Sequence, residues 1–298
     1  MLPLESVPNV SEGRDRHVVD ELAEAFGRSA RLLDVHTDAD HNRSVFTLVG
    51  EDERLVDSLV AGVGRARELI DLRRHVGVHP RVGAADVVPL VPLRPPDMPR
   101  ARAAALAVAE RIGGELGLPV FLYGEVGEGR RPAFFRRGGP AELQRRIDAG
   151  ELRPDVGPRR LDAAAGAVLV GARGPLIAFN VDLRTGDVEV ARAVAAAVRA
   201  TGGGFPGVRA LGLQLPGSGR VQVSMNVEDW EAAALAAIVA RVEELAAAHG
   251  VEVAGSELVG LMPAGAAAAA AGALLRIDGF DATHLLELRL LDPPGENP

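Results

Sequence analysis

The sequence predicts an α+β protein, an α/β sandwich, built from two tandem halves. Three observations support this fold class: strand-like and helix-like apolar periodicities alternate along the chain, the order β-α-β-β-α-β occurs twice, and a segment rich in Gly, Pro and Arg separates the two occurrences. This order is the split βαβ arrangement of ferredoxin-like folds, with helices on one face of a sheet. We place the boundary at Phe179, which gives subdomains of 1–179 and 180–298. We expect a ligand cleft between them.

The first half begins with a short predicted strand at 5–8, followed by a helix over 14–27. Ser11 is the expected N-cap of this helix, because its hydroxyl can accept a hydrogen bond from the first turn. Apolar residues recur at helical spacing from 51 to 70, which predicts a second helix. The other elements of this half are strands at 32–36, 44–49, 86–93 and 119–123 and a helix at 100–116.

The second half repeats the order after a connector at 138–166, which holds one amphipathic stretch at 141–149. The sequence Pro-Gly-Ser-Gly at 216–219 is a strong turn signal between two strands. The predicted elements are strands at 176–181, 208–215, 220–226 and 251–254 and helices at 188–201 and 229–249. An alanine-rich segment at 263–273 predicts a terminal helix that packs on the domain or forms an oligomer contact.

The composition is that of a soluble globular protein. The chain has 298 residues, of which 47% are hydrophobic and 25% charged, and its formal net charge is -8. An acidic chain lacks the basic footprint of nucleic-acid binding, so we expect no nucleic-acid partner. The N-terminus has no signal-peptide pattern, and the longest apolar run, at 263–275, is too short to span a bilayer. We therefore expect a cytoplasmic protein with no membrane partner.

Two residue types are missing, and both absences exclude chemistry. There is no cysteine, which rules out disulfides, thiolate metal sites and a cysteine nucleophile. The printed sequence also contains no lysine, so all 33 basic residues are arginine. A Schiff base to pyridoxal phosphate and a P-loop lysine are therefore impossible, and we expect no pyridoxal phosphate. Anions must be bound by arginine, histidine, backbone N–H groups or helix N-termini.

The stretch HVGVHPRVGAAD at 75–86 is the main candidate for chemistry. Histidine is the side chain whose ordinary pKa lies nearest neutrality, and Pro80 holds His79 on non-helical backbone. In one interpretation His79 is a general base or acid that Arg81 and Asp86 help to orient.

Two other interpretations of this stretch remain open. His75 and His79, with His36 and His41, have the residue types of a metal site, but Gly77 and Pro80 oppose the helix that their spacing requires. We therefore expect no metal. A plain surface loop with ordinary hydrogen bonds is equally compatible with the composition.

Further candidates lie in loops. The loop at 36–43 offers Asp38, Asp40, Asn42 and Arg43, which suit an amino or amidine group and a carboxylate, or else form a solvated hairpin. Its resemblance to a calcium loop fails, because the required Gly and distal Glu are missing. Glu125 follows a predicted strand as a site carboxylate or a turn residue. The loop at 155–166 can receive an anionic tail or serve as a connector, and the arginine run at 130–137 is typical of a solvated face.

Eight motifs occur in an order that resembles one known family, glutamate formimidoyltransferase, the formiminotransferase domain of formimidoyltransferase-cyclodeaminase. They are VPNVSEGR, LLDVHTDADHNRSVFTLVG, HVGVHPRVGAADVVPLVP, VFLYGE, PDVGP, GARGPLIAFNVDL, QVSMNVEDW and GSELVGLMP. The resemblance covers the chain from about Val7 to the terminal segment. It implies two α/β subdomains with a folate-binding tunnel between them. It also implies transfer of the formimino group of N-formimino-L-glutamate to N5 of tetrahydrofolate, a step of histidine degradation.

The resemblance also implies roles for particular residues. The family's catalytic histidine corresponds to His79, with Arg81, Gly83 and Asp86 matching beside it. The folate-contacting loop corresponds to Gly157, Pro158 and Gly166, which precede the strand that ends at Gly171-Ala172-Arg173.

Two departures from the family pattern bear on these roles. Some members have an acidic residue where His36 stands, which shifts a pocket carboxylate to Asp38 or Asp40. The loop 159–165, RRLDAAA, lacks an aromatic residue that some members carry. We expect Arg43, Arg81 or Arg173 to hold the glutamate carboxylates.

The implied co-substrate is tetrahydrofolate, with or without a polyglutamate tail, and the implied assembly is a homodimer. A separate cyclodeaminase is expected for the next step. Three alternatives remain: N-formyl-L-glutamate as the donor, giving 5-formyltetrahydrofolate; a folate- or anion-binding protein without catalysis; and a metal-dependent hydrolase. The formyl and formimino donors differ only by O in place of NH.

Overall fold

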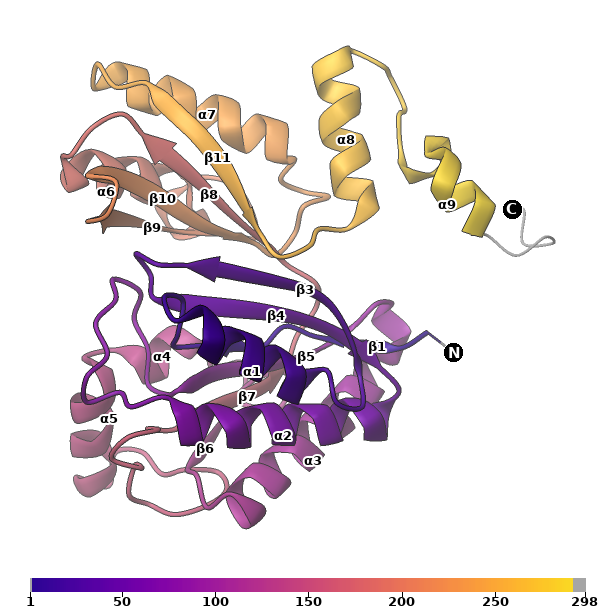
Figure 1. Ribbon diagram of the computed structural model, residues 1–298. Coiled ribbons are helices and arrows are strands. Elements are labelled where there is room, and N and C mark those ends of the chain that lie inside the picture. Colours follow the sequence, from indigo (N-terminus) through magenta and orange to yellow (C-terminus); the bar gives the residue numbers. More distant parts are fainter. Residues whose placement is uncertain (1, 292–298) are drawn as a thin grey trace. The chain divides into compact units, whose positions relative to one another are not determined.

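The structure is a computed structural model that describes residues 2–291, with side chains through residue 289. The described residues fold as two compact units, residues 2–175 and 176–291, which Figure 1 shows in indigo to pink and in salmon to yellow. Phe179, where the sequence analysis places the boundary, lies inside strand β8 (Ile177–Leu183) of the second unit. The mixed α+β class and the tandem β-α-β-β-α-β order are confirmed.

The first unit contains a seven-stranded sheet. Its strands are β1 (Leu4–Ser6), β2 (Asn9–Val10), β3 (Arg31–Asp38), β4 (Arg43–Gly50), β5 (Ala85–Pro92), β6 (Val120–Gly124) and β7 (Val168–Ala172). Strands β1 and β2 both pair with β4 and β5, so they act as one strand interrupted at Val7 and Pro8. Proline causes this break because it has no N–H for the ladder. The pairs among β3, β4, the broken strand and β5 are antiparallel, whereas β5–β7 and β6–β7 are parallel.

Helices cover both faces of this sheet, which corrects the prediction of helices on one face, because the two helices between β6 and β7 pack on the second face. On one face lie α1 (Arg16–Phe26), α2 (Asp52–Leu69) and α3 (Met98–Glu115), and on the other α4 (Pro132–Arg136) and α5 (Gly139–Asp148) (Figure 1). Successive residues of β6 point to opposite faces of the sheet. Val120 packs in the same hydrophobic core as Phe26, and Phe121 packs in a second core with Phe135. The parallel strands need helical crossovers, which α3 and the α4–α5 pair provide.

The start of α1 corrects one prediction. The helix begins at Arg16, and its N-cap is Asp15, whose carboxylate accepts hydrogen bonds from the backbone N–H groups of His17 and Val18. Ser11 is buried instead, and its hydroxyl donates to the carbonyl of Gly83 at 2.7 Å. The predicted cap was wrong because the hydroxyl is taken by a partner 72 residues away.

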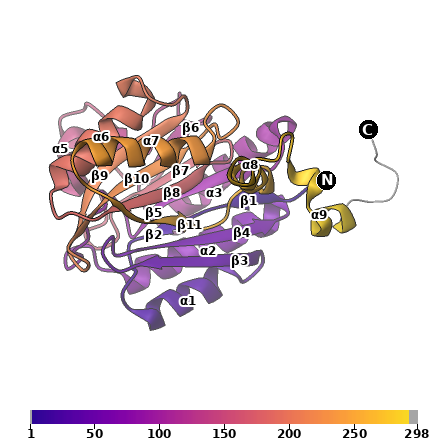
Figure 2. The same cartoon turned by 90° about the horizontal axis from the view of Figure 1, so that it is seen from above.

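The second unit has the full ferredoxin-like topology. Its four-stranded antiparallel sheet has the order β11-β8-β10-β9. Figure 2 shows α6 and α7 side by side over this sheet, and their apolar faces bury Val194 and Ile238. The remaining elements are α6 (Val188–Val198), β9 (Val208–Leu215), β10 (Arg220–Val227), α7 (Leu235–Ala248), β11 (Val253–Val259), α8 (Ala264–Leu275) and α9 (Leu286–Leu291).

Two boundaries in this unit differ from the sequence prediction. Helix α7 begins six residues later than position 229, because the carboxylate of Asp229 accepts a hydrogen bond from the N–H of Ala232 and closes a turn. Strand β11 is longer than predicted and carries an irregularity between Val253 and Gly255. The alanine-rich helix is present as α8. Across residues 2–291, no helix combines the length and the apolar character needed to cross a membrane.

Candidate active site

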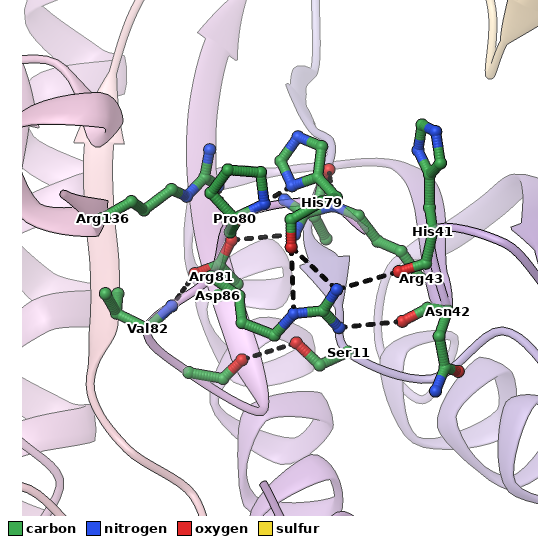
Figure 3. Close-up of polar contacts among 12 residues, drawn as sticks. Ser11, His41, Asn42, Arg43, His79, Pro80, Arg81, Val82, Asp86 and Arg136 are labelled. Carbon is green, nitrogen blue, oxygen red and sulfur yellow. Dashed lines mark hydrogen bonds and ion pairs between the residues drawn. The ribbon is translucent and has the colours of Figure 1, made fainter. Parts of the chain in front are cut away.

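A buried carboxylate, that of Asp86 on β5, connects three parts of the first unit (Figure 3). Its Oδ2 accepts from Nη1 of Arg43 at 2.8 Å and from Nη2 of Arg136 at 2.5 Å, and its Oδ1 accepts from the N–H of Val82 at 2.8 Å. Arg43 is at the start of β4 and is buried, and its Nε donates to Oδ1 of Asn9 at 2.9 Å. The carboxylate therefore ties β4, β5 and α4 to the segment that follows His79.

The charges in this cluster are fixed at neutral pH. Burial alone raises the pKa of Asp86, but Arg136, Arg43 and the Val82 N–H together hold that pKa below its usual range. Burial lowers the pKa of Arg43 to about 10, opposed by its attraction to Asp86. Asp86 therefore remains an anion and Arg43 a cation, so neither is suited to exchange protons during a reaction.

His79, unlike Asp86 and Arg43, is held in its uncharged form. Burial, followed by the positive charges of Arg43 and Arg136, lowers its pKa well below the ordinary value, with Asp86 opposing. Nδ1 of the half-buried ring lies 2.8 Å from the carbonyl oxygen of Pro80. A carbonyl oxygen can only accept, which assigns the proton to Nδ1 and leaves the lone pair on Nε2. His79 is thus a neutral imidazole at pH 7 with a defined tautomer, which is the state of a general base.

Arg81 holds the backbone around this histidine. Its Nη2 donates to the carbonyl of His79 at 2.8 Å and to that of His41 at 2.9 Å, and its Nη1 donates to the carbonyl of Asn42 at 3.1 Å. Burial lowers its pKa to about 10, so it stays charged. Arg81 also contacts the ring of His75, whose pKa burial lowers. One guanidinium thereby fixes two loops relative to each other.

The β3–β4 loop is shaped by its own polar residues. Oδ1 of Asp38 accepts from the N–H of His41 at 2.7 Å. Asn42 has a left-handed φ of 46°, and its side chain accepts from the N–H of Gly13 and donates to the carbonyl of Val76. Asp38 and Asn42 therefore support the loop through backbone contacts.

This loop places the ring of His41 next to His79. The two ring centroids are 5.9 Å apart and the ring planes are tilted by 36°. His41 is 7% exposed, and its Nε2 has no hydrogen-bond partner among the residues that the structure describes. Within that same part of the chain, no group of three or more His, Asp or Glu side chains is placed to hold a metal ion.

Several glycines of the sequence motifs are required by close backbone contacts. A Cβ on Gly83 would lie 1.9 Å from the carbonyl oxygen of Ala167, and one on Gly166 would lie 2.1 Å from that of Val82. Gly166 and Gly157 also have φ values of +71° and +83°, which favour glycine. These contacts join the loop at 157–166 to the segment before β5.

Other predicted site residues lie outside the Asp86 cluster. Glu125 and Pro158 are exposed. Arg173 is partly exposed, and its Nη1 donates to the carbonyl of Gly174. In the described part of the chain, none of these three residues is hydrogen-bonded to Asp86, His79 or Arg81.

Two members of the cluster, Arg136 and Asn9, are not among the site residues predicted from the sequence. Arg136 belongs to the arginine run interpreted as a solvated face, yet only 14% of its side chain is exposed because it pairs with Asp86. That interpretation is wrong for Arg136, and only the buried aspartate of another element could have indicated it. Asn9, in the first motif, orients Arg43.

Known proteins resemble this chain over nearly its whole length. The family profile described as "Formiminotransferase domain, N-terminal subdomain" matches residues 3–173, and "Formiminotransferase domain" matches residues 178–280. Glutamate formimidoyltransferase of Streptococcus pyogenes serotype M1 is 39% identical over 295 residues, covering 97% of this chain and 98% of that protein. Glutamate formimidoyltransferase of Thermoplasma acidophilum is 38% identical over 296 residues, covering 96% and 97%. Formimidoyltransferase-cyclodeaminase of Rattus norvegicus is 37% identical over 271 residues, covering 87% of this chain and 50% of that protein.

Proposed function

Because the chain belongs to the formiminotransferase family, we propose that it transfers the formimino group of N-formimino-L-glutamate to N5 of tetrahydrofolate. The membership makes the chain a transferase. The observation that supports the specific reaction best is the state of His79, a neutral imidazole whose Nδ1–H donates to the Pro80 carbonyl. Its Nε2 lone pair can take a proton from an attacking amine.

The proposed reaction has two steps. N5 of tetrahydrofolate attacks the formimino carbon, the N5–C bond forms, and the C=N electron pair moves onto the imino nitrogen. Nε2 of His79 takes the proton that N5 loses. The C–N bond to glutamate then breaks, the C=N bond forms again, and His79 gives its proton to the departing nitrogen. His79 ends neutral, so the imidazole is regenerated for the next turnover.

The cationic surroundings of His79 favour this cycle. Arg43 and Arg136 disfavour a proton on the resting imidazole, while Asp86 limits their effect. The protonated ring is therefore a strong acid during the second step and releases its proton readily to the leaving amine. Arg81 contributes by positioning the His79 backbone, since its guanidinium donates to the carbonyl of that residue.

The family resemblance supports the remaining assignments. We propose that Gly157, Pro158 and Gly166 form the loop that contacts folate, and that Glu125 and Arg173 bind substrate. Asp38 and Asn42 contribute by shaping the His41 loop, as their backbone contacts indicate.

The test is a steady-state assay of the purified protein with tetrahydrofolate and either N-formimino-L-glutamate or N-formyl-L-glutamate. Release of L-glutamate from each donor is measured. We expect turnover that is faster with the formimino donor. Equal or faster turnover with the formyl donor would replace the proposed substrate, and folate binding without turnover of either donor would contradict catalysis.

A further inference from the structure

His41 is a buried polar group without a partner beside the proposed base. His41 is 7% exposed, and its Nε2 is hydrogen-bonded to none of the residues that the structure describes. Leaving a buried donor or acceptor unpaired costs about 1–3 kcal/mol. Such groups are rare in folded proteins, and a catalytic role is one of the explanations for them. The ring therefore suggests a partner that arrives with the substrate.

The backbone of His41 is held by the same guanidinium that holds the backbone of His79. Nη2 of Arg81 donates to the carbonyls of both histidines, at 2.9 Å and 2.8 Å. Asp38 anchors the N–H of His41 at 2.7 Å. Figure 3 shows the two imidazole rings on the same side of the Arg81 guanidinium. With centroids 5.9 Å apart, both rings can reach one small group, such as the three atoms of an N–C–N unit.

We propose that His41 is a second catalytic residue of the formimino transfer described above, donating a hydrogen bond from Nε2 to the imino nitrogen of the reacting group. This inference rests on the proposed function. In the ground state the protonated formimino group has delocalised nitrogens, which donate hydrogen bonds and accept them poorly. When N5 attacks, the electron pair localises on the imino nitrogen and creates an acceptor. Nε2–H of His41 gains its partner at that point, as a donor does in an oxyanion hole.

A hydrogen bond that forms only in the transition state raises kcat without lowering KM. The role of His41 can therefore be separated from simple packing. Phenylalanine at this position keeps an aromatic ring against His79 but has no donor. Glutamine places its amide nitrogen close to the position of Nε2 and has no ring. A packing role therefore predicts that His41→Phe is the more active variant. A donor role predicts that His41→Gln is the more active variant.

The experiment compares wild type, His41→Phe and His41→Gln in the formimino transfer assay. We expect His41→Phe to lower kcat by about 10²-fold, the effect of removing one such donor, with KM changed less than threefold. We expect His41→Gln to be at least tenfold faster than His41→Phe. Thermal unfolding of both variants checks that they are folded, and His249→Phe, at an exposed position, is the matched control with unchanged activity.

The outcomes separate this inference from the proposed function. An inactive wild type overturns the proposed function and this role together. An active wild type with His41→Phe within threefold of its kcat overturns only the role of His41. A rise in KM at constant kcat in both variants also overturns it, because the ring would then bind substrate equally in the ground state and the transition state.

Discussion

The two units share one topology but differ in what they bury. Each has the β-α-β-β-α-β order with two helices against a sheet. In the first unit the ladder is interrupted at Pro8, and an extension from α3 to β7 adds two parallel strands. In the second unit β8 runs without a break and no such extension follows in the described chain. The buried ion pairs of Asp86 are in the first unit, whereas in the second unit the side-chain amide of Gln222 donates a hydrogen bond to Oδ1 of Asp182.

This difference shows where the candidate chemistry comes from. The shared core supplies Arg43 from β4 and Asp86 from β5, and the extension supplies Arg136 from α4. The common topology by itself therefore does not produce a site. If the first unit carries the chemistry and the second serves as a scaffold, matched substitutions in the two units have different effects on activity and stability.

The largest expected effect is on catalysis. His79→Ala should lower kcat by about 10²–10⁴-fold, because a positioned base contributes that much. The free energy of unfolding should change by less than about 1 kcal/mol, since the ring is only half-buried. Steady-state kinetics and urea unfolding measure the two effects. His249→Ala in the second unit is the control, and an equal loss of kcat there would break the distinction between the units.

The next largest effect is on stability. Asp86→Asn removes the anion that buried Arg43 and mostly buried Arg136 share, and leaving buried charges unpaired costs about 3–5 kcal/mol. The matched change in the second unit, Asp182→Asn, affects a hydrogen bond from Gln222 and should cost about 1 kcal/mol or less. Urea unfolding at pH 7 gives both values. Similar losses in the two variants would show that the Asp86 cluster is not the special feature of the first unit.

A smaller effect is expected for glycine substitutions. Gly83→Ala places a Cβ 1.9 Å from the Ala167 carbonyl oxygen, which the backbone cannot accommodate without shifting, so we expect a loss of about 1–3 kcal/mol. At Gly255 of β11 an added Cβ meets nothing within 4 Å, so Gly255→Ala should stay within about 0.5 kcal/mol of wild type. Thermal unfolding compares them. A neutral Gly83→Ala would contradict the close approach.

The smallest effect is a pH dependence of stability. The pKa values of His75 and His79 are lowered by burial, whereas an unfolded histidine titrates near pH 6.5. Below that pH the unfolded chain takes up protons that the folded state does not, so stability falls as pH falls. Each ring contributes at most about 1.4 kcal/mol per pH unit, because one histidine takes up no more than one proton. Partial exposure of both rings reduces the contribution further.

Urea unfolding at pH 7.5 and pH 5.5 tests this dependence. The double variant His75→Gln/His79→Gln should lose less stability between the two pH values than wild type. An equal loss in wild type and the variant would place the acid sensitivity elsewhere in the protein.

The sequence predicted elements well where periodicity is strong. The helix expected over 51–70 is α2 at 52–69, and the repeated element order is present in both units. Failures occur where a residue's partner is far away in sequence. Ser11 is not a cap because Gly83 takes its hydroxyl, and Arg136 is not solvated because Asp86, 50 residues earlier, pairs with it. The homodimer and the cytoplasmic location stay predictions.

The proximity of His41 to His79 illustrates the same limit. Both residues stand in quoted motifs, but their separation along the chain gives no indication that their rings lie 5.9 Å apart. The family resemblance identified the motif of His79 and implied no role for His41. Local sequence patterns therefore located the reacting loops, and only the fold relates one loop to the other.

The hydrogen bond from the Val82 N–H to Asp86 provides a means of observing the cluster without any substrate. Val82 precedes β5 and is fully buried, so its amide proton is protected by a side chain rather than by a ladder. Exchange of this single proton with deuterium requires the carboxylate to release it. The exchange rate of the Val82 amide therefore reports how often the ion-pair cluster opens in the intact, folded protein.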